Sequence, residues 1–399
     1  MDRIIMKVTA KCSLLMAAYY SMTCVLLSYI AYYLGSVGIS DLSISILIGL
    51  SCAAGGVLQI AAGRIADRDP RWNWKRIMLL IGTGEIILAV SRLLISYQGW
   101  QCFAYGLMIV FQLIMMPMVN LASFYYPAKG IPVNFGVARG IGSAAFALVS
   151  FLTGKLTEMS GSGSLLIITV VLSVLFLAAV WIMPYDENNE RSADKVQSTD
   201  HAPKTKLTYF VRKYSVFTSV TVGITLLFVY HNMVNSFFIR IVEAAGGNSK
   251  SLGIALAVAA IAELPVLFLY SRISGGRSNA SVWLLVIAGS FFVIRGVLYI
   301  AAASVTMIYF IQLLQSVSYG LAIAAKATYA DESMAAEDKA TGQALMTFTD
   351  AFGCVAGSVI GGVLLDIGGI GLVLKIGLLI AFIGTIIMLI TAIKGQGRR

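Results

Sequence analysis

Residues 164–183 read SLLIITVVLSVLFLAAVWIM and contain no charged side chain. An α-helix needs about 20 predominantly apolar residues to cross the hydrocarbon of a bilayer, so this stretch predicts a transmembrane helix. The whole chain has the same character, because 58% of its 399 residues are hydrophobic and 12% are charged. A soluble protein of this length could not bury so much apolar surface. The sequence therefore predicts a membrane protein.

Further apolar stretches bring the predicted number of transmembrane helices to twelve. Turn-forming glycines such as Gly161 and Gly163, or Gly368 and Gly369, separate neighbouring stretches. The expected spans are residues 10–34, 41–63, 77–96, 99–124, 137–160, 162–184, 214–241, 250–272, 281–303, 305–330, 341–367 and 368–394. This pattern predicts an all-α membrane protein, and the even number of spans places both termini on one side of the membrane.

The positions of the basic residues predict the orientation of the chain. The net charge is +10, with 29 Lys and Arg against 19 Asp and Glu. By the expected spans, 23 basic residues lie on the side of the termini, Lys326 and Lys339 among them, and 3 lie on the other side: Lys155, Arg240 and Lys250. Short cytoplasmic loops retain Lys and Arg, which predicts a multi-pass protein of the cytoplasmic (inner or plasma) membrane with both termini cytoplasmic. This distribution also accounts for the positive charge without a nucleic-acid partner.

A long polar stretch, residues 185–213, is expected to be a flexible cytoplasmic linker. It divides the chain into two six-helix halves, residues 1–184 and 214–399. A weak repeat supports this division: SRLL at 91–94 matches IRGV at 294–297, and FQL at 111–113 matches IQL at 311–313. The shared offset of about 200 residues indicates duplicated halves, which are common in secondary transporters.

Several classes of function are excluded or disfavoured. No Gly-x4-Gly-Lys-Ser/Thr loop occurs, so this chain does not itself drive transport with ATP. No nucleophile with a base, metal-ligand cluster or pair of catalytic acids stands out, and the chain has 2 histidines. We therefore expect no enzyme activity, no cofactor and no metal. A membrane sensor or scaffold stays open as a remote alternative, although no receptor module accompanies the spans.

The loop after the second expected span carries a specific motif. It reads GRIADR at 63–68 and ends in KR at 75–76. This resembles the signature of the major facilitator superfamily, and the resemblance extends over essentially the whole chain. It implies two six-helix bundles, alternating access and a gating loop formed by Gly63, Asp67, Arg68, Lys75 and Arg76. A solvated charge run that only sets the topology is the alternative reading of this loop.

Within that superfamily the chain is most similar to the lactose permease and phenylpropionate permease branch. The similarity rests on GVARGIGS at 136–143, Phe146 and AELP at 262–265. Gln315 and Ser318 replace the histidine and glutamate that lactose permease has in its tenth helix. We therefore do not expect galactoside recognition or proton coupling by that route. The fifth span also lacks the Gly/Pro motif of drug antiporters, which favours import over efflux.

Ionisable residues inside a membrane span are costly and usually face a cavity or a partner. The carboxylic acids of this kind are the proton-coupling candidates: Glu263, Asp350 and Glu85. Glu263 ranks first because Pro265 frees backbone groups nearby in an apolar helix. A salt bridge between helices is the alternative role, and Glu85 and Arg92 are each expected to pair across helices.

Polar residues within the spans are the candidates for binding a solute. They comprise three arginines, a cluster in the seventh span and four glutamines: Arg92, Arg139, Arg295, Tyr230, His231, Asn232, Asn235, Gln59, Gln112, Gln312 and Gln315. Asn, Gln and Arg suit hydroxyl and carboxylate groups, and Tyr suits a ring. We expect a monomeric secondary transporter in the lipid bilayer that carries a sugar, nucleoside or aromatic acid by proton symport. A proton-independent uniporter or exchanger, or an efflux permease, stays open.

Overall fold

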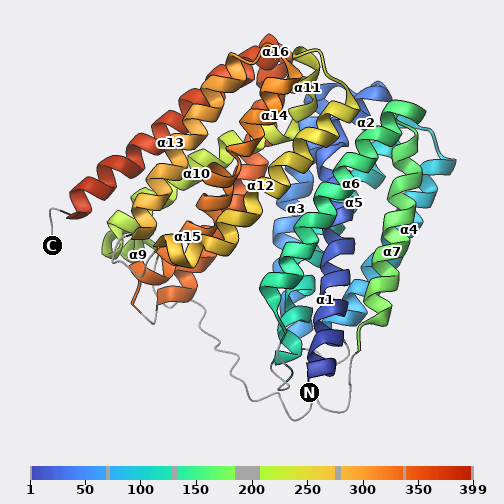
Figure 1. The fold of residues 1–399 in the computed structure, drawn as a ribbon, viewed down its shortest axis with the longest axis horizontal. Coiled ribbons are helices and arrows are strands. Elements are labelled where there is room, and N and C mark those ends of the chain that lie inside the picture. The colour runs from blue at the N-terminus through green and yellow to red at the C-terminus, as the bar shows by residue number, and fades with distance from the viewer. Residues whose placement is uncertain are drawn as a thin grey trace. The chain divides into compact units, whose positions relative to one another are not determined.

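The computed structural model describes residues 2–68, 72–127, 131, 133–184, 207–274, 280–335 and 338–396. These ranges are helical, with no β-strand among them. The chain divides into two compact units, each described separately below (Figure 1). The N-terminal unit contains residues 1–198 and 248–261, and the C-terminal unit contains residues 199–247 and 262–399.

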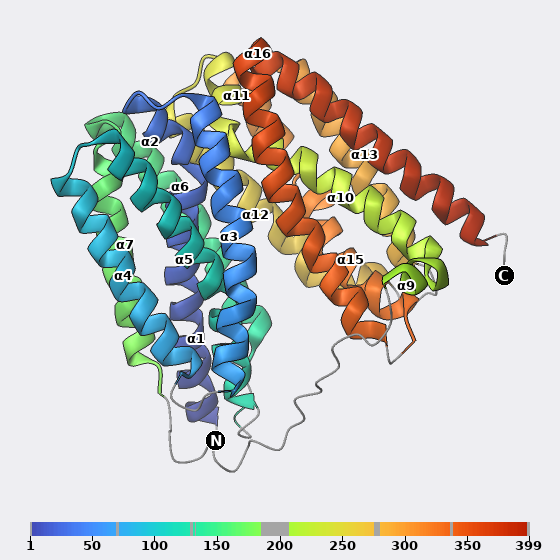
Figure 2. The ribbon, with the colours of Figure 1, turned by 180° about the vertical axis from the view of Figure 1, so that it is seen from behind.

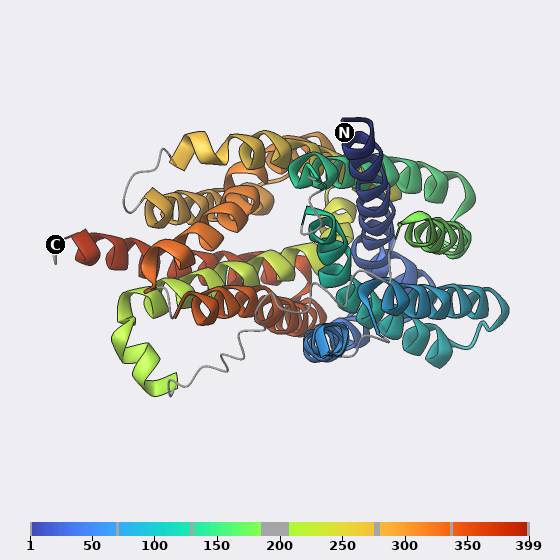
Figure 3. The same ribbon diagram turned by 90° about the horizontal axis from the view of Figure 1, so that it is seen from below.

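The N-terminal unit is a bundle of long helices. They are α1 (Asp2–Thr23), the π-helical turn η1 (Cys24–Ser28), α2 (Ile30–Ser36), α3 (Asp41–Arg68), α4 (Trp74–Leu94), α5 (Gln98–Tyr125), α6 (Phe135–Ser160), α7 (Ser164–Ile182) and the first half of α12 (Ser249–Ser274). Helix α3 packs against α5 and helix α4 against α7, as Figure 2 shows. Helix α1, dark blue in Figure 3, packs against α6.

The C-terminal unit is built around two long helices that lie side by side. Its elements are α9 (Leu207–Lys213), α10 (Ser215–Ser236), α11 (Phe238–Ala244), the rest of α12, α13 (Ala280–Ile300), α14 (Val305–Leu313), the π-helical turn η4 (Ser316–Gly320), α15 (Leu321–Ser333) and α16 (Lys339–Gln396). Helix α10 packs along α16, and α13 packs against both α16 and α15 (Figure 2).

The predicted twelve crossings are confirmed in the described ranges. Eleven helical segments are long and apolar enough to span a bilayer, and the last of them, Thr341–Lys394, has 54 residues. That length suits two crossings, and the helix breaks at Gly368 and Gly369, where Gly369 has a φ of 67°. A left-handed φ is readily adopted by glycine, which explains why the turn falls at this residue.

Local sequence signals set several helix ends. The side chain of Asn73 accepts a hydrogen bond of 2.9 Å from the backbone N–H of Arg76 and so caps α4. Asn134 caps α6 in the same way, through the N–H of Val137. Gly161, with a φ of 76°, ends α6. Caps of this kind fix where α4 begins and where α6 begins and ends.

Two expectations differ from the structure. The seventh span was expected to run over residues 214–241, but α10 ends at Ser236 because Phe237 leaves the helical conformation, and α11 then begins at Phe238. The expected linker ends in a helix, α9, whose Lys213 pairs with Asp338 at 2.7 Å. Residues 185–206 of that linker lie outside the described part of the chain.

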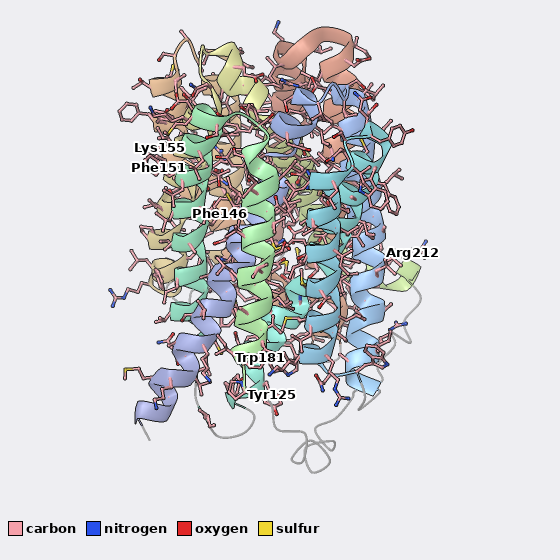
Figure 4. The ribbon with its side chains drawn as sticks, turned by 90° about the vertical axis from the view of Figure 1, so that its right-hand side faces the viewer. Tyr125, Phe146, Phe151, Lys155, Trp181 and Arg212 are labelled. Atoms are coloured by element: carbon pink, nitrogen blue, oxygen red, sulfur yellow. The ribbon has the colours of Figure 1, made fainter. Side chains whose placement is uncertain are left out.

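Apolar side chains cover the outside of the helices, as a lipid environment requires. Along α7 the exposed residues recur at helical spacing: Ile167, Val171, Val174, Leu175, Trp181 and Ile182. Figure 4 shows Phe151 and Lys155 projecting from α6, and Trp181 and Tyr125 at the opposite end of the unit. Trp181 is 74% exposed, and exposed aromatic residues near helix ends are typical of the membrane interface.

Candidate functional site

A buried arginine forms the centre of a polar cluster in the C-terminal unit. Arg295 on α13 is 3% exposed, and its two Nη atoms donate to Ser318 Oγ at 2.9 Å, to Tyr299 Oη at 3.0 Å and to Gln312 Oε1 at 3.1 Å. The Tyr299 hydroxyl also donates to Gln312 Oε1, at 2.8 Å. The structure thus brings together Arg295 and Gln312, two of the predicted binding residues, and adds Tyr299 and Ser318.

The π-helical turn η4 places two of the residues in this region. Its signature is the hydrogen bond from the N–H of Gly320 to the carbonyl of Gln315, 3.0 Å long, which spans five residues instead of four. Ser318 in this turn binds Arg295, and Tyr319 stacks on the ring of His231 with centroids 4.1 Å apart. Single π-helical turns inside α-helices often occur at functional sites.

The predicted cluster of α10 lies partly in this region. His231 is 6% exposed, and its Nε2 forms a hydrogen bond of 2.8 Å with the Asn235 amide. Asn232 turns back on its own helix and donates to the carbonyl of Phe228 at 2.9 Å. The hydroxyl of Tyr230 and the Oε1 of Gln315 are buried without a hydrogen-bond partner among the described residues. These two atoms are thus polar groups in the protein interior without a protein partner among the described residues.

An ion pair links α15 and α16 within the membrane-spanning part of the C-terminal unit. The Lys326 ammonium binds the Asp350 carboxylate, and it also lies 4.4 Å from the centroid of the Phe228 ring. The side chain of Lys326 is 9% exposed and that of Asp350 is 45% exposed. Lys326 was placed with the cytoplasmic loops at the sequence level, and this assignment is wrong because the residue is buried inside the span Val305–Ser333.

The other proton-coupling candidate of this unit lies on α12. Glu263 is half-buried, and its side chain lies beside the π-helical turn, close to Gly320. Gly320 directly follows Tyr319, which stacks on His231. The first-ranked proton-coupling candidate thus lies beside the π-helical turn of the C-terminal unit.

A second buried arginine organises the N-terminal unit. Arg92 on α4 is 2% exposed, and its Nε donates to Gln101 Oε1 at 3.2 Å. Its guanidinium lies over the rings of Tyr33 and Tyr105, at 4.8 and 4.3 Å. The Tyr33 hydroxyl donates to the same Gln101 oxygen, at 2.8 Å. Each unit therefore holds a buried arginine against a glutamine oxygen that also accepts from a tyrosine.

Glu85 does not form the expected ion pair across helices among the described residues. Glu85 is fully buried, and neither of its carboxyl oxygens has a hydrogen-bond partner among the described residues. Arg92 lies two helical turns further along α4 and is held by Gln101 and by aromatic rings. The expectation that both residues form ion pairs across helices is therefore wrong, because the aromatic cage and the amide stabilise the guanidinium instead.

Three further candidates lie elsewhere in the N-terminal unit. Gln112 on α5 donates to the carbonyl of Tyr19 on α1 at 3.1 Å, and its Oε1 is buried without a partner among the described residues. Arg139 on α6 lies 4.0 Å from the centroid of the Tyr20 ring and donates to Ser143 at 3.0 Å. Gln59 is half-buried on α3.

The predicted gating loop is described in part. Gly63 lies in α3 with open space around it, and Lys75 donates to the last carbonyls of α7, those of Trp181 at 3.1 Å and of Met183. The N–H of Arg76 binds the capping Asn73. Lysine at a helix C-terminus stabilises the partial negative charge there. Asp67 and Arg68 have side chains outside the described part of the chain, so their gating role stays a prediction.

Sequence reasoning missed Lys326, Gln101, Tyr299 and the partner role of Ser318. Lys326 had a detectable signal, because it is the one basic residue in the apolar stretch 305–330. The others had none, since Gln and Tyr near span ends are common and their contacts depend on helix packing.

The chain matches the family described as MFS_1 like over residues 10–376, and no curated protein matches its sequence. The nucleoside transporter NupG superposes with a TM-score of 0.79 at 13% identity, covering 96% of this chain and 98% of that chain. A bacterial homologue of the human lysosomal transporter Spinster, inward-facing and occupied, gives 0.67 at 15% identity, with 98% and 96% covered. A peptide-bound POT family transporter gives 0.70 at 12% identity, also with 98% and 96% covered.

Because the sequence identities to the solved structures are low, those structures show only that the fold is shared. The match to the family over residues 10–376 shows that the chain belongs to that family. The finer resemblance to the lactose permease and phenylpropionate permease branch stays a prediction. The helical architecture, the twelve crossings and the match over residues 10–376 lead to one conclusion. The chain belongs to the MFS_1 like family of major facilitator transporters, and it is a multi-pass membrane transporter rather than an enzyme.

Proposed function

We propose that this transporter is a secondary active carrier that moves a small polar organic solute across the cytoplasmic membrane by alternating access, in symport with protons. Two six-helix halves, residues 1–184 and 214–399, joined by a cytoplasmic linker at 185–213, would form the moving parts. Both termini would lie in the cytoplasm, because 22 basic residues remain on that side once Lys326 is removed from the 23 counted there. The carrier would work as a monomer in the bilayer, without a cofactor.

The observation that carries this proposal is the pair of buried arginines, Arg92 and Arg295, inside membrane-spanning helices. A charge at this depth is costly and is retained where it has a task. Guanidinium groups suit carboxylates and vicinal hydroxyls because their donors are arranged as a fork. Arg295 still has an Nε without a partner among the described residues, and the free Tyr230 hydroxyl and Gln315 oxygen supply further polar contacts.

The solute class follows from the groups around these arginines. Stacking of Tyr319 on His231 provides a platform for a ring, and Gln, Asn and Arg provide partners for hydroxyls or a carboxylate. Sugars, nucleosides and aromatic acids all meet these requirements. The similar fold of NupG, a nucleoside transporter, supports including nucleosides among the first solutes tested.

Proton coupling requires an acid that can exchange protons during the cycle, and three acids qualify. Glu263 lies beside Gly320 of the π-helical turn, Asp350 is paired with Lys326, and Glu85 is buried without a hydrogen-bond partner among the described residues. Sequence reasoning ranks Glu263 first. The contact with Lys326 supports Asp350, because protonation of a paired carboxylate releases its cationic partner.

Two experiments test the proposed function. A thermal-shift screen of the purified protein against sugars, nucleosides and aromatic acids identifies a ligand, because a ligand that binds the folded state raises the melting temperature. Uptake of that ligand into proteoliposomes, with and without a pH gradient, then tests transport and coupling. Accumulation that follows the pH gradient supports symport. Equilibration that ignores the gradient identifies a uniporter or exchanger, and absence of transport for every ligand that binds overturns the proposal.

A further inference from the structure

The two side chains of the intramembrane ion pair, Lys326 and Asp350, differ in how deeply they are buried. The lysine side chain is 9% exposed, whereas that of the aspartate is 45% exposed. The carboxylate therefore lies at the surface of the unit, with the ammonium behind it. Lys326 lies seven residues before the end of α15, which is roughly 10 Å along the helix axis. Burial of an ion pair at this depth costs desolvation free energy, which an apolar contact between the same helices would avoid.

An aromatic ring lies beside the ammonium of Lys326. Lys326 Nζ lies 4.4 Å from the ring centroid of Phe228 on α10. The Phe228 ring lies 5.9 Å from that of Tyr319, which stacks on His231. A cation beside an aromatic ring suits an organic anion, since the charge binds the anionic group and the ring contacts the apolar part.

The other titratable groups near the pair have their own contacts. Arg295 on α13 binds Ser318, Tyr299 and Gln312, and His231 on α10 binds Asn235. On α12, Glu263 lies beside Gly320, and at the end of α15 Glu332 accepts from Ser281 of α13 while Tyr329 stacks on Phe217 of α10. The described contacts thus make Asp350 and Lys326 each other's ionic partner.

From this arrangement we propose that Lys326 is the binding residue for the anionic group of a carboxylate solute, and that Asp350 is the proton carrier that exchanges with it. This inference rests on the proposed function and deepens it. In the empty carrier Asp350 neutralises Lys326. A proton bound to a carboxylate oxygen of Asp350 releases the ammonium, which then pairs with the carboxylate of the solute. One proton and one monoanion enter together, so the net charge of the site is unchanged and transport is electroneutral.

The wild-type protein provides the first test. Benzoate and benzamide have nearly the same shape but differ in charge, and uridine represents the neutral nucleosides. In proteoliposomes with an alkaline interior, benzoate should accumulate faster than in protein-free liposomes, into which benzoic acid diffuses unaided. Benzamide should not accumulate, and a membrane potential set with valinomycin should leave the benzoate uptake unchanged. Binding should take up one proton per anion, so the Kd for benzoate should rise about tenfold per pH unit once Asp350 is ionised.

Variants of the pair provide the second test. Lys326→Gln should weaken benzoate binding by at least about tenfold, because a hydrogen bond to a charged group contributes about 1.5–3 kcal/mol. Asp350→Asn should keep benzoate exchange and lose accumulation under a pH gradient, with a Kd that no longer depends on pH. Lys339→Gln is the matched control, since it removes the ammonium of an exposed pair with Asp331 and should behave as the wild type.

Folding is controlled with the double variant Lys326→Gln/Asp350→Asn, which leaves neither charge unpaired. A melting temperature close to the wild-type value together with lost benzoate transport supports the proposal. Gradient-driven benzoate accumulation by this double variant that is faster than in protein-free liposomes overturns it. If uridine accumulates and benzoate neither binds nor accumulates, the carboxylate inference is wrong while the proposed transport function stands. If no tested solute of any class is transported, both are wrong.

Discussion

The guanidinium of Arg295 donates a hydrogen bond of 2.9 Å to the hydroxyl of Ser318, which lies in the π-helical turn of the tenth transmembrane helix. The same guanidinium holds Tyr299 and Gln312, so one side chain ties α13 to α14 and η4. Arg92 holds Gln101 at an equivalent place in the N-terminal unit. These two arginines are therefore the natural starting point for tests of the site.

Replacement of Arg295 or Arg92 with lysine should impair transport more than folding. Lysine keeps the charge but loses the planar fork that reaches two partners at once. Loss of about 1.5–3 kcal/mol at the binding step corresponds to roughly tenfold to hundredfold weaker binding. Uptake assays and melting temperatures measured on the same preparations separate the two effects. Full activity in both lysine variants would remove the arginines from the site.

Glu263→Gln separates the two leading proton carriers. If Asp350 carries the proton, this variant should still concentrate the solute under a pH gradient, because it retains both Asp350 and Lys326. Loss of accumulation in Glu263→Gln, with exchange intact and with accumulation retained in Asp350→Asn, would instead identify Glu263 as the carrier. Glu85→Gln is the corresponding variant in the N-terminal unit and is assayed in parallel.

The contact between α9 and the loop before α16 predicts a dependence of stability on pH. Hydrogen bonds from Lys213 and Tyr214 lower the pKa of Asp338 from its ordinary value of 3.8, and the bond to Asp338 raises the pKa of Lys213 above 10.5. A carboxyl group whose pKa is lowered by folding stabilises the folded state at pH values above its ordinary pKa. This stabilisation is lost as the pH falls and the carboxylate is protonated. The raised pKa of Lys213 stabilises the folded state below pH 10.5, and this stabilisation is lost as the pH rises further and the ammonium loses its proton.

The stabilisation is therefore complete between about pH 4 and pH 10. Melting temperatures of wild type and Asp338→Asn in detergent should differ by a constant amount at pH 5 to 9, and the difference should shrink below pH 4. A difference that does not change as the pH falls would contradict the ion-pair assignment.

Close packing of α10 on α16 predicts a strong effect of a small substitution. A Cβ added at Gly357 would lie 2.5 Å from the carbonyl oxygen of Val229 and 2.8 Å from Cβ of Asn232. Gly357→Ala should therefore cost about 1–3 kcal/mol through overpacking. Gly371→Ala in the same helix is the control, because nothing lies within 4 Å of that position. Equal melting temperatures for the two variants would show that the helices separate easily here.

The orientation of the chain can be tested with reporters. A reporter fused after Arg399 or inserted near Asp194 should behave as cytoplasmic, and one inserted near Gly247 as exterior, because basic residues concentrate on the side of the termini. An exterior C-terminus would overturn this orientation.

Much of the fold could be predicted from the sequence because a bilayer imposes a simple length rule on every helix. The apolar stretches gave twelve crossings, and Gly368 and Gly369 marked the break in α16. The interruption at Phe237 was not predictable, since Asn235-Ser236-Phe237 carries no helix-breaking residue. Likewise, the partner of Lys326 depends on how α15 packs against α16, which no local pattern encodes.

The candidate site was predictable as a set of residue types and not as a set of contacts. Arg295 and Gln312 were both identified from polarity within apolar spans, and they meet at 3.1 Å. Glu85 was expected to pair and does not, because desolvation and packing are decided by residues on other helices. Polarity against an apolar background therefore finds candidates, while their partners need the three-dimensional arrangement.

The π-helical turn over Ser316–Gly320 gives the tenth transmembrane helix one residue more than a regular helix of the same number of turns. Each residue of an α-helix rotates the chain by about 100° around the axis. If Ser316–Gly320 wound as a regular α-helix with no residue removed, all of α15 would turn around the axis by about that angle. Lys326 would then point away from Phe228 and Asp350, and an alanine neighbour would replace it. The extra residue held in the π-helical turn thus sets the rotation of α15 that directs Lys326 toward Asp350.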